Sequence, residues 1–140
     1  MLLFKGLAAR KRLFLVLYPD GVQLNFTIYD KSFPLRGVAV VTSYLPARIF
    51  VGIDQQDLEK QSLYSIFEHT YKRKLQWAEE LIGAVVAGEE EATVLQTSPG
   101  SALLLIKETT YDSQNVAIEY SVSLLRGDRY TASVISVRKS

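Results

Sequence analysis

Hydrophobic and polar residues alternate strictly in one early part of the chain. Val22, Leu24, Phe26 and Ile28 fall on one face of residues 22–29, and mostly polar side chains fall on the other. A two-residue period of this kind is typical of a half-buried β-strand. Further stretches with strand-like composition lie at residues 13–18, 36–44, 75–87, 102–112, 116–125 and 130–138. The last three follow one another through short connections and therefore predict an antiparallel meander.

A helical period replaces this alternation at residues 62–74. Apolar residues recur there at intervals of three and four positions, at Leu63, Ile66 and Phe67. Residues 88–95 predict a second, short helix, because three glutamates lie near its start, where the helix dipole favours negative charge. Residues 54–60 allow one further helical turn, whereas residues 1–12 show no clear period and are interpreted as helical or irregular.

About six strands and two or three helices, with consecutive strands mostly adjacent, predict an α+β domain. We expect a mainly antiparallel six-stranded sheet with helices packed on one face. A length of 140 residues suits a single domain that spans residues 1–140 and buries its own core.

Composition and charge narrow the classes of function. The chain has 16 basic and 15 acidic residues, a net charge of +1, so it has little electrostatic reason to bind nucleic acid by itself. It has no cysteine, which excludes disulfides and thiolate metal sites and fits a reducing, cytoplasmic location. No apolar run approaches the ~18 residues of a membrane-spanning helix. We therefore expect no membrane association, no metal and no cofactor.

One carboxylate is unusual for its place in the predicted strand 116–125. Glu119 lies in mid-strand, where a charge is disfavoured and, if buried, costs roughly several kcal/mol unless it is paired. Ser121 and Ser123 share its face by the two-residue period. The opposite face is predicted to be core, with Ile118, Tyr120, Val122 and Leu124. The polar strip is either the floor of a ligand pocket or a solvated outer face, and the pattern leaves both interpretations open.

Other candidate features have simple structural explanations. Ser62 opens the predicted helix 62–74, either as its N-cap or as part of an anion site at the helix N-terminus. His69, the single histidine, is interpreted as a surface residue, and Arg126-Gly127-Asp128 as a turn. The sequence contains no Gly-rich phosphate loop and no nucleophile elbow, so its enzyme signals are weak.

Six short motifs occur in an order that resembles the UTRA domain, the effector-binding domain of HutC-type GntR transcriptional regulators. They are SYLPARIF from residue 43, SLY from residue 62, AVVAGEEEATVL from residue 84, SPGSALLLIKETTYD from residue 98, IEYSVSLLRGDRY from residue 118, and a closing hydrophobic strand with Arg138. Each motif is unspecific alone, but together they extend over residues 38–138, whereas residues 1–37 match poorly.

The resemblance implies a fold similar to that of chorismate lyase and a role as a metabolite sensor. In relatives that bind phosphorylated amino sugars, an S-x-Y motif and the glutamate of an E-Y motif contact the ligand; these match Ser62, Tyr64 and Glu119. A tyrosine six residues further on also contributes there, but this position is Leu125 here. Those relatives carry an Arg-x-Arg pair on an early strand, whereas residues 23–29 contain no arginine, so a bidentate phosphate clamp is missing.

Arg36 or Arg48 are the candidates to replace that clamp. Ser43 of the first motif, together with Ser121 and Ser123, completes the ligand-binding set that we expect from the resemblance. The resemblance implies the effector-sensing and dimerisation domain of a bacterial transcriptional regulator. Its partners would be a small-molecule effector, such as a sugar or organic acid, and a second copy of the chain. It would contact DNA only through a winged-helix domain that this chain does not contain.

Two alternatives stay open from the sequence. The chain is instead a chorismate lyase-like enzyme that acts on a small aromatic or hydroxy acid, with Glu119 as its general acid or base. Or it is a pure dimerisation module whose pocket is filled by its own side chains.

Overall fold

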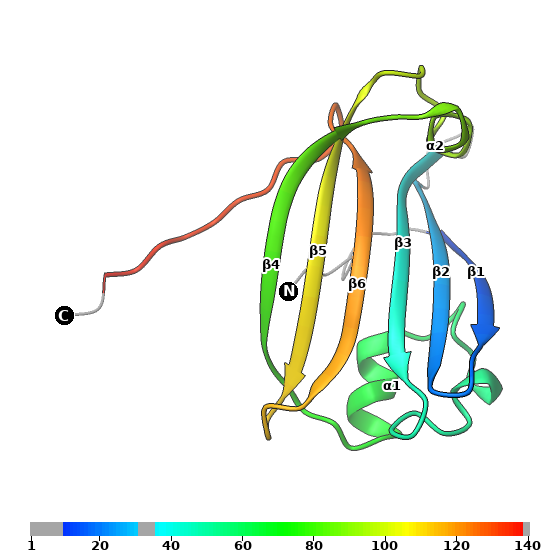
Figure 1. Cartoon of the computed structure of the whole chain (residues 1–140), viewed down its shortest axis with the longest axis vertical. Helices are drawn as coiled ribbons and strands as arrows, with labels where there is room; N and C mark the ends of the chain where they lie inside the picture. The colour runs from blue at the N-terminus through cyan, green and yellow to red at the C-terminus, as the bar shows by residue number, and fades with distance from the viewer. Residues whose placement is uncertain (1–9, 31–35, 139–140) are drawn as a thin grey trace.

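The computed structural model describes residues 10–30 and 36–138. Within these residues, six strands form one antiparallel sheet in the order β1-β2-β3-β6-β5-β4 (Figure 1). The strands are β1 (Arg10–Leu17), β2 (Gly21–Asp30), β3 (Arg36–Pro46), β4 (Leu75–Val86), β5 (Ala102–Asp112) and β6 (Ala117–Arg126). The predicted α+β fold on a six-stranded antiparallel sheet is confirmed in this part of the chain.

Short helical elements connect the strands: η1 (Ile53–Gln55), α1 (Leu63–His69) and α2 (Glu89–Leu95). The helix α1 begins after Ser62, as predicted, but it ends well before residue 74. Lys72 adopts a left-handed φ of 56°, which turns the chain out of the helical path so that β4 can begin.

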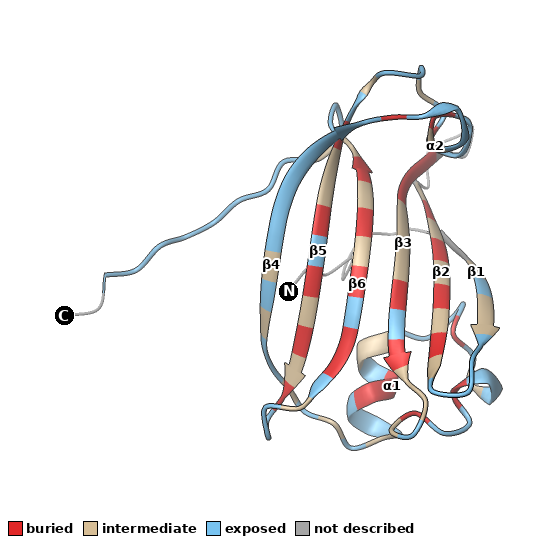
Figure 2. Ribbon diagram, in the orientation of Figure 1, coloured by how far each residue is buried: buried red, intermediate tan, exposed pale blue. Residues whose placement is uncertain are grey.

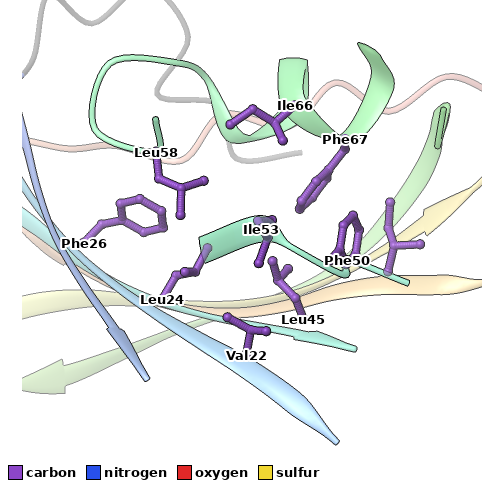
Figure 3. Close-up of a cluster of buried hydrophobic side chains, with 10 residues drawn as sticks. Val22, Leu24, Phe26, Leu45, Phe50, Ile53, Leu58, Ile66 and Phe67 are labelled. Carbon is purple, nitrogen blue, oxygen red and sulfur yellow. The ribbon is translucent and has the colours of Figure 1, made fainter. Parts of the chain in front are cut away.

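The main core lies between the sheet and the segment that contains η1 and α1. Alternate residues of β2, Val22, Leu24 and Phe26, are buried on this side, as their period predicts. They pack with buried residues of the 50–67 segment, including Phe50 and Phe67, whose ring centroids are 4.5 Å apart (Figure 3). We call this side of the sheet the inner face.

The helix α2 packs elsewhere, at the end of the sheet far from α1 (Figure 1). Its buried residues Ala92 and Leu95 contact Val40 and Leu124. These two strand residues are cross-strand partners, and they alternate with the inner-face residues of β3 and β6. The helix α1 therefore covers the inner face, and α2 packs at one end of the sheet.

The predicted strand at residues 130–138 does not form; this prediction is wrong. The meander requires a third strand beside β6, but β6 is already hydrogen-bonded to β3 on one side and β5 on the other. No edge of β6 is left for pairing. The chain instead leaves the sheet after Tyr130 and runs outward in an extended path (Figure 1).

The N-terminal prediction is corrected in part. Residues 10–12, interpreted as helical or irregular, belong to β1, while residues 1–9 lie outside the described part of the chain. In the described residues, no helix is long and apolar enough to cross a membrane.

Aromatic pairs lie on exposed parts of the sheet. The cross-strand partners Tyr44 and Tyr120 have ring centroids 6.0 Å apart. At the start of β4, Trp77 stacks on Tyr111 with centroids 4.1 Å apart and an interplanar angle of 7°. The indole N–H of Trp77 donates to the Asn115 side chain at 2.8 Å. Figure 2 shows that most of β4 is exposed, whereas β2, β3, β5 and β6 carry bands of buried residues.

Candidate functional site

A cluster of polar side chains lies buried on the inner face, where β3, β6 and β5 run side by side. The register pairs Ser43 with Ser121, Ser121 with Glu108, and Glu119 with Thr110. All five side chains are buried, although each one is polar. We call Ser43, Tyr64, Glu108, Thr110 and Glu119, which hydrogen-bond to one another, the polar cluster.

Glu119 is at the centre of the polar cluster and is 5% exposed. The Ser43 hydroxyl donates to its Oε2 at 2.5 Å, and the Tyr64 hydroxyl donates to its Oε1 at 3.2 Å. Burial raises the pKa of Glu119, and the hydrogen bonds from Ser43 and Tyr64 oppose this rise only in part. The carboxyl group is therefore a hydrogen-bond acceptor that also takes up a proton more readily than an exposed glutamate.

Tyr64 reaches the cluster from the first turn of α1. Its hydroxyl lies 3.2 Å from Oε1 of Glu119 and 3.2 Å from Oε1 of Glu108, so it bridges two strands. Burial raises the pKa of Tyr64 far above its usual range, and the nearby charges of Glu119 and Glu108 raise it further. The phenol therefore stays protonated, and its single proton is available to one carboxyl group at a time.

Glu108 is the second buried carboxyl group, with 1% of its surface exposed. Thr110 donates to its Oε1 at 3.2 Å, and Glu80 lies directly opposite it on β4. A hydrogen bond with Glu108 lowers the pKa of Glu80. The register therefore sets a carboxyl group of β4 beside the buried carboxyl group of β5.

The structure brings together Ser43, Tyr64 and Glu119 from the predicted ligand-binding set. Ser121 and Ser123 are buried on the same face of β6 as Glu119. Ser62, however, is exposed, and its side chain accepts a hydrogen bond from the Ser65 backbone N–H as the N-cap of α1. It acts as the cap and does not reach the polar cluster.

The arginines predicted to replace a phosphate clamp lie apart from the cluster. Arg36 begins β3, seven positions before Ser43 along the same strand, a separation of about 23 Å in an extended chain. Arg48 is exposed in the turn after β3. Leu125, which stands where phosphosugar-binding relatives have a tyrosine, is buried in an apolar cluster with Ile28 and Ile106.

The predicted orientation of β6 is wrong for most of the strand. Tyr120 is 40% exposed, and Val122 and Leu124 are only partly buried, although these residues were predicted to be core. Glu119, Ser121 and Ser123 form the buried face instead. Hydrophobicity alone favoured the wrong face, because Glu119 of β6 finds hydrogen-bonding partners inside the domain, Ser43 on β3 and Tyr64 on α1.

Two members of the polar cluster, Glu108 and Thr110, are absent from the predicted set. A signal for them exists in the sequence: Ile106, Glu108 and Thr110 fall on one face of β5, so a glutamate lies in mid-strand here as well. A second mid-strand carboxylate on the adjacent strand of the predicted meander points to a shared polar site.

The structure also places His69 and the turn after β6. His69 is exposed, and its Nδ1 lies 2.9 Å from the Ser65 carbonyl oxygen within α1. Residues 127–129 form a turn, with Arg126 and Asp128 paired at 2.6 Å. In the part of the chain that the structure describes, no group of three or more acidic or histidine side chains is arranged to hold a metal ion.

These features define a class: an α+β domain whose antiparallel sheet holds a buried polar cluster beneath a short helix. Residues 36–131 match the family model of the UTRA domain, and the chain belongs to this family. The resemblance inferred from the six motifs is thereby confirmed.

Two relatives come from Bacillus subtilis (strain 168). The chain is 31% identical over 94 residues to the HTH-type transcriptional repressor NagR, and the aligned region covers 67% of this chain and 38% of NagR. It is 30% identical over 115 residues to the uncharacterized HTH-type transcriptional regulator YurK, which covers 82% of this chain and 46% of YurK. The chain thus spans less than half the length of these relatives, both of which are transcriptional regulators.

A solved structure confirms the fold. The effector domain of PhnF from Mycobacterium smegmatis matches 95% of this chain and 90% of its own, with a TM-score of 0.80 and 24% sequence identity.

Proposed function

We propose that this chain senses a small-molecule effector at the polar cluster and thereby controls DNA binding by a GntR-type regulator. The observation that carries the proposal is the pair of buried carboxyl groups, Glu108 and Glu119, bridged by one hydroxyl from α1. Burying carboxyl groups lowers the stability of a fold, so a purely structural sheet would place apolar residues there. Polar groups that converge beneath a short helix are instead what a binding site requires.

The chemistry of Glu119 restricts the effector. In the described part of the chain, its hydrogen bonds come from the hydroxyl groups of Ser43 and Tyr64 and not from a cationic side chain. A phosphate placed there would be repelled by the carboxylate, whereas a hydroxyl, amide or ammonium group would donate a hydrogen bond to it. We therefore expect the effector to present a hydrogen-bond donor at Glu119.

Tyr64 couples this site to the position of α1. An effector that donates to Glu119 competes with the Tyr64 hydroxyl, which is fixed to the first turn of the helix. Release of Tyr64 changes how α1 packs on the sheet. A ligand shifts such an equilibrium only to the extent that it binds the two arrangements with different affinity.

The DNA-binding step belongs to the whole regulator. The relatives are HTH-type regulators more than twice as long as the matched region, so we infer that a separate winged-helix domain contacts the operator. We also propose a homodimer in the cytoplasm, because a two-fold symmetric operator is matched by a two-fold symmetric protein. Since the relatives are transcriptional regulators, we expect binding of the effector without turnover.

A thermal-shift screen tests this proposal. The domain is heated with sugars, sugar phosphates, amino acids, histidine-degradation intermediates and phosphonates. A compound present at about 100 times its dissociation constant adds roughly 2.7 kcal/mol of stability. Glu119→Gln is expected to weaken the best compound at least about tenfold, because one charged hydrogen bond contributes about 1.5–3 kcal/mol.

Glu68→Gln is the matched control, because Glu68 is an exposed glutamate on the same helix as Tyr64. It should bind the compound as the wild-type chain does. Equal affinity of the Glu119→Gln variant would show that the effector binds elsewhere. Conversion of an aromatic or hydroxy acid that disappears in Glu119→Gln would favour the enzyme over the sensor.

A further inference from the structure

The segment after β6 has the properties of a strand that lacks a neighbour. Residues 131–138 follow an extended path but belong to no helix or strand (Figure 1), and no backbone hydrogen bond joins them to the rest of the described chain. The segment is rich in β-branched residues, and Val134, Ile135 and Val137 are 76%, 88% and 84% exposed. Three large aliphatic side chains in water and a row of unpaired backbone groups are unfavourable in an isolated domain.

The sheet has two edge strands in the described residues, β1 and β4, and they differ in how they are protected. The β1 strand is the shorter of the two, with 8 residues, and a short edge strand offers less backbone for a further strand to pair with. The β4 strand has 12 residues, contains no lysine, arginine or proline, and ends in the apolar run Leu81–Val86 interrupted only by glycine and alanine. Leu81 and Val86 are 63% and 71% exposed.

We propose that residues 131–138 of one chain pair with the free edge of β4 in a second copy of the chain. By two-fold symmetry, the second copy returns the same contact. The proposal deepens the homodimer put forward above, because it assigns the surface on which the two copies meet.

The length of the segment and the charge of Arg138 favour an antiparallel pairing with β4. Eight extended residues span about 26 Å, and the 12 residues of β4 are long enough to accept them. If the segment runs antiparallel to β4, Arg138 comes to lie beside Glu79, an exposed residue in the first half of the strand. The same alignment sets Ile135 beside Ile82. A parallel arrangement would place Arg138 beside the apolar end of β4 instead.

The path of the segment favours a second copy as the partner. After Tyr130, the chain passes the end of the sheet and continues away from its own β4 (Figure 1). Tyr130 itself packs against the apolar cluster of Ile28 and Leu125, which anchors the start of the segment to its own domain. An anchored and outward-directed strand can reach a neighbouring molecule.

The first test removes the segment. Truncation after Tyr130 is compared with the full chain by sedimentation equilibrium. The truncated chain should fold, because the lost residues make no backbone hydrogen bonds to their own domain, and should dimerise at least about 100-fold more weakly. A triple change of Val134, Ile135 and Val137 to serine should have the same effect, while Ser133→Ala with Ser136→Ala should not. A dimer of unchanged affinity after truncation would overturn the proposal.

The second test locates the segment. Because the chain has no cysteine, single cysteines give a clean disulfide assay. Chains with Ile135→Cys and one affinity tag are co-expressed with chains that carry a second tag and Leu81→Cys, Ile82→Cys or Gly83→Cys. A disulfide between differently tagged chains is expected for at least one pair. Two controls are made: chains with Phe14→Cys on β1 in place of the β4 cysteine, and chains that carry both cysteines. The assignment would be refuted by a disulfide to Phe14→Cys, by a disulfide that forms only within a chain carrying both cysteines, or by no disulfide at all.

These results are separable from effector sensing. The polar cluster lies on the inner face of β3, β5 and β6, away from the free edge of β4. Effector binding by the truncated chain, measured in the same preparation, reports on the proposed function alone. Loss of the dimer with retained binding supports the edge pairing, and retained dimer with lost binding contradicts it.

Discussion

Replacing Glu119 by glutamine removes a buried acid and preserves the shape of the side chain. The amide oxygen still accepts a hydrogen bond from Ser43, and the amide NH2 group can donate to the Tyr64 hydroxyl. That hydroxyl can then donate to Glu108. The variant therefore isolates the charge of Glu119 from its packing.

The magnitude follows from the raised pKa of Glu119, which has burial as its main cause. The folded chain holds this proton more tightly than the unfolded chain does. The stabilisation of the folded chain by the proton on Glu119 is thus fully present below the ordinary glutamate pKa of about 4.3. It is lost as the pH rises through the pKa that Glu119 has in the folded chain. Each unit of increase in pKa costs about 1.4 kcal/mol of unfolding free energy at pH values above the folded pKa. Glutamine has no such proton, so the variant lacks this decline.

Urea unfolding measured at about pH 4.5, 5.5, 6.5, 7.5 and 8.5 gives the free energy of unfolding of both chains. The difference between wild type and Glu119→Gln should change with pH by up to about 1.4 kcal/mol per unit until Glu119 is ionised, and then stay constant. The variant gains relative stability as the pH rises. A difference that is independent of pH over this range would show that Glu119 has an ordinary pKa, and the account of its burial would be wrong.

Three further changes test other contacts. Tyr64→Phe removes the donor shared by Glu119 and Glu108 and should lower the free energy of unfolding by about 1–3 kcal/mol, measured in urea; no loss would mean that the bridge is not formed in solution. Asp112 is buried, which alone would raise its pKa, but hydrogen bonds from the backbone N–H groups of Val116 and Gln114 and from Arg73 lower the pKa below its usual range. The stabilisation of the folded chain by ionised Asp112 is present above about pH 4 and is lost on acidification. Asp112→Ala should therefore reduce the free energy of unfolding by about 1–3 kcal/mol at pH 7 and by less in acid. An equal loss at both pH values would show that the ionised carboxylate does not stabilise the fold. At Gly37 a Cβ atom would overlap the Val94 carbonyl oxygen, so Gly37→Ala should displace α2 and lower the melting temperature, whereas Gly83→Ala, with nothing nearby, should be tolerated.

The strands were predictable because each follows its own period. Val22, Leu24 and Phe26 repeat every second residue, and Pro46 marks the end of β3, so local chemistry alone sets these elements. The position of β6 between β3 and β5 is not local. It depends on a pairing between residues 43 and 121, which are distant in the sequence, and it decides that residues 130–138 cannot pair with β6.

The candidate site was found in part for the same reason. Glu119 attracted attention as a mid-strand carboxylate, and the family motif added Tyr64, but only the register shows that Glu108 lies beside them. The burial of the polar face of β6 could not be read from hydrophobicity, because it depends on hydroxyl groups from two other elements, Ser43 and Tyr64. Ser62 was correctly expected to be a possible N-cap, and the cap is what occupies its side chain.

The stacking of Trp77 on Tyr111 gives the domain an optical label of its own. Trp77 is the single tryptophan, it is 43% exposed, and it lies near the start of β4 with its indole N–H held by Asn115. The intrinsic fluorescence of the protein therefore comes almost entirely from one end of one edge strand. Its emission would follow the solvation of that edge, while events at Glu119 would reach it only through the intervening strands.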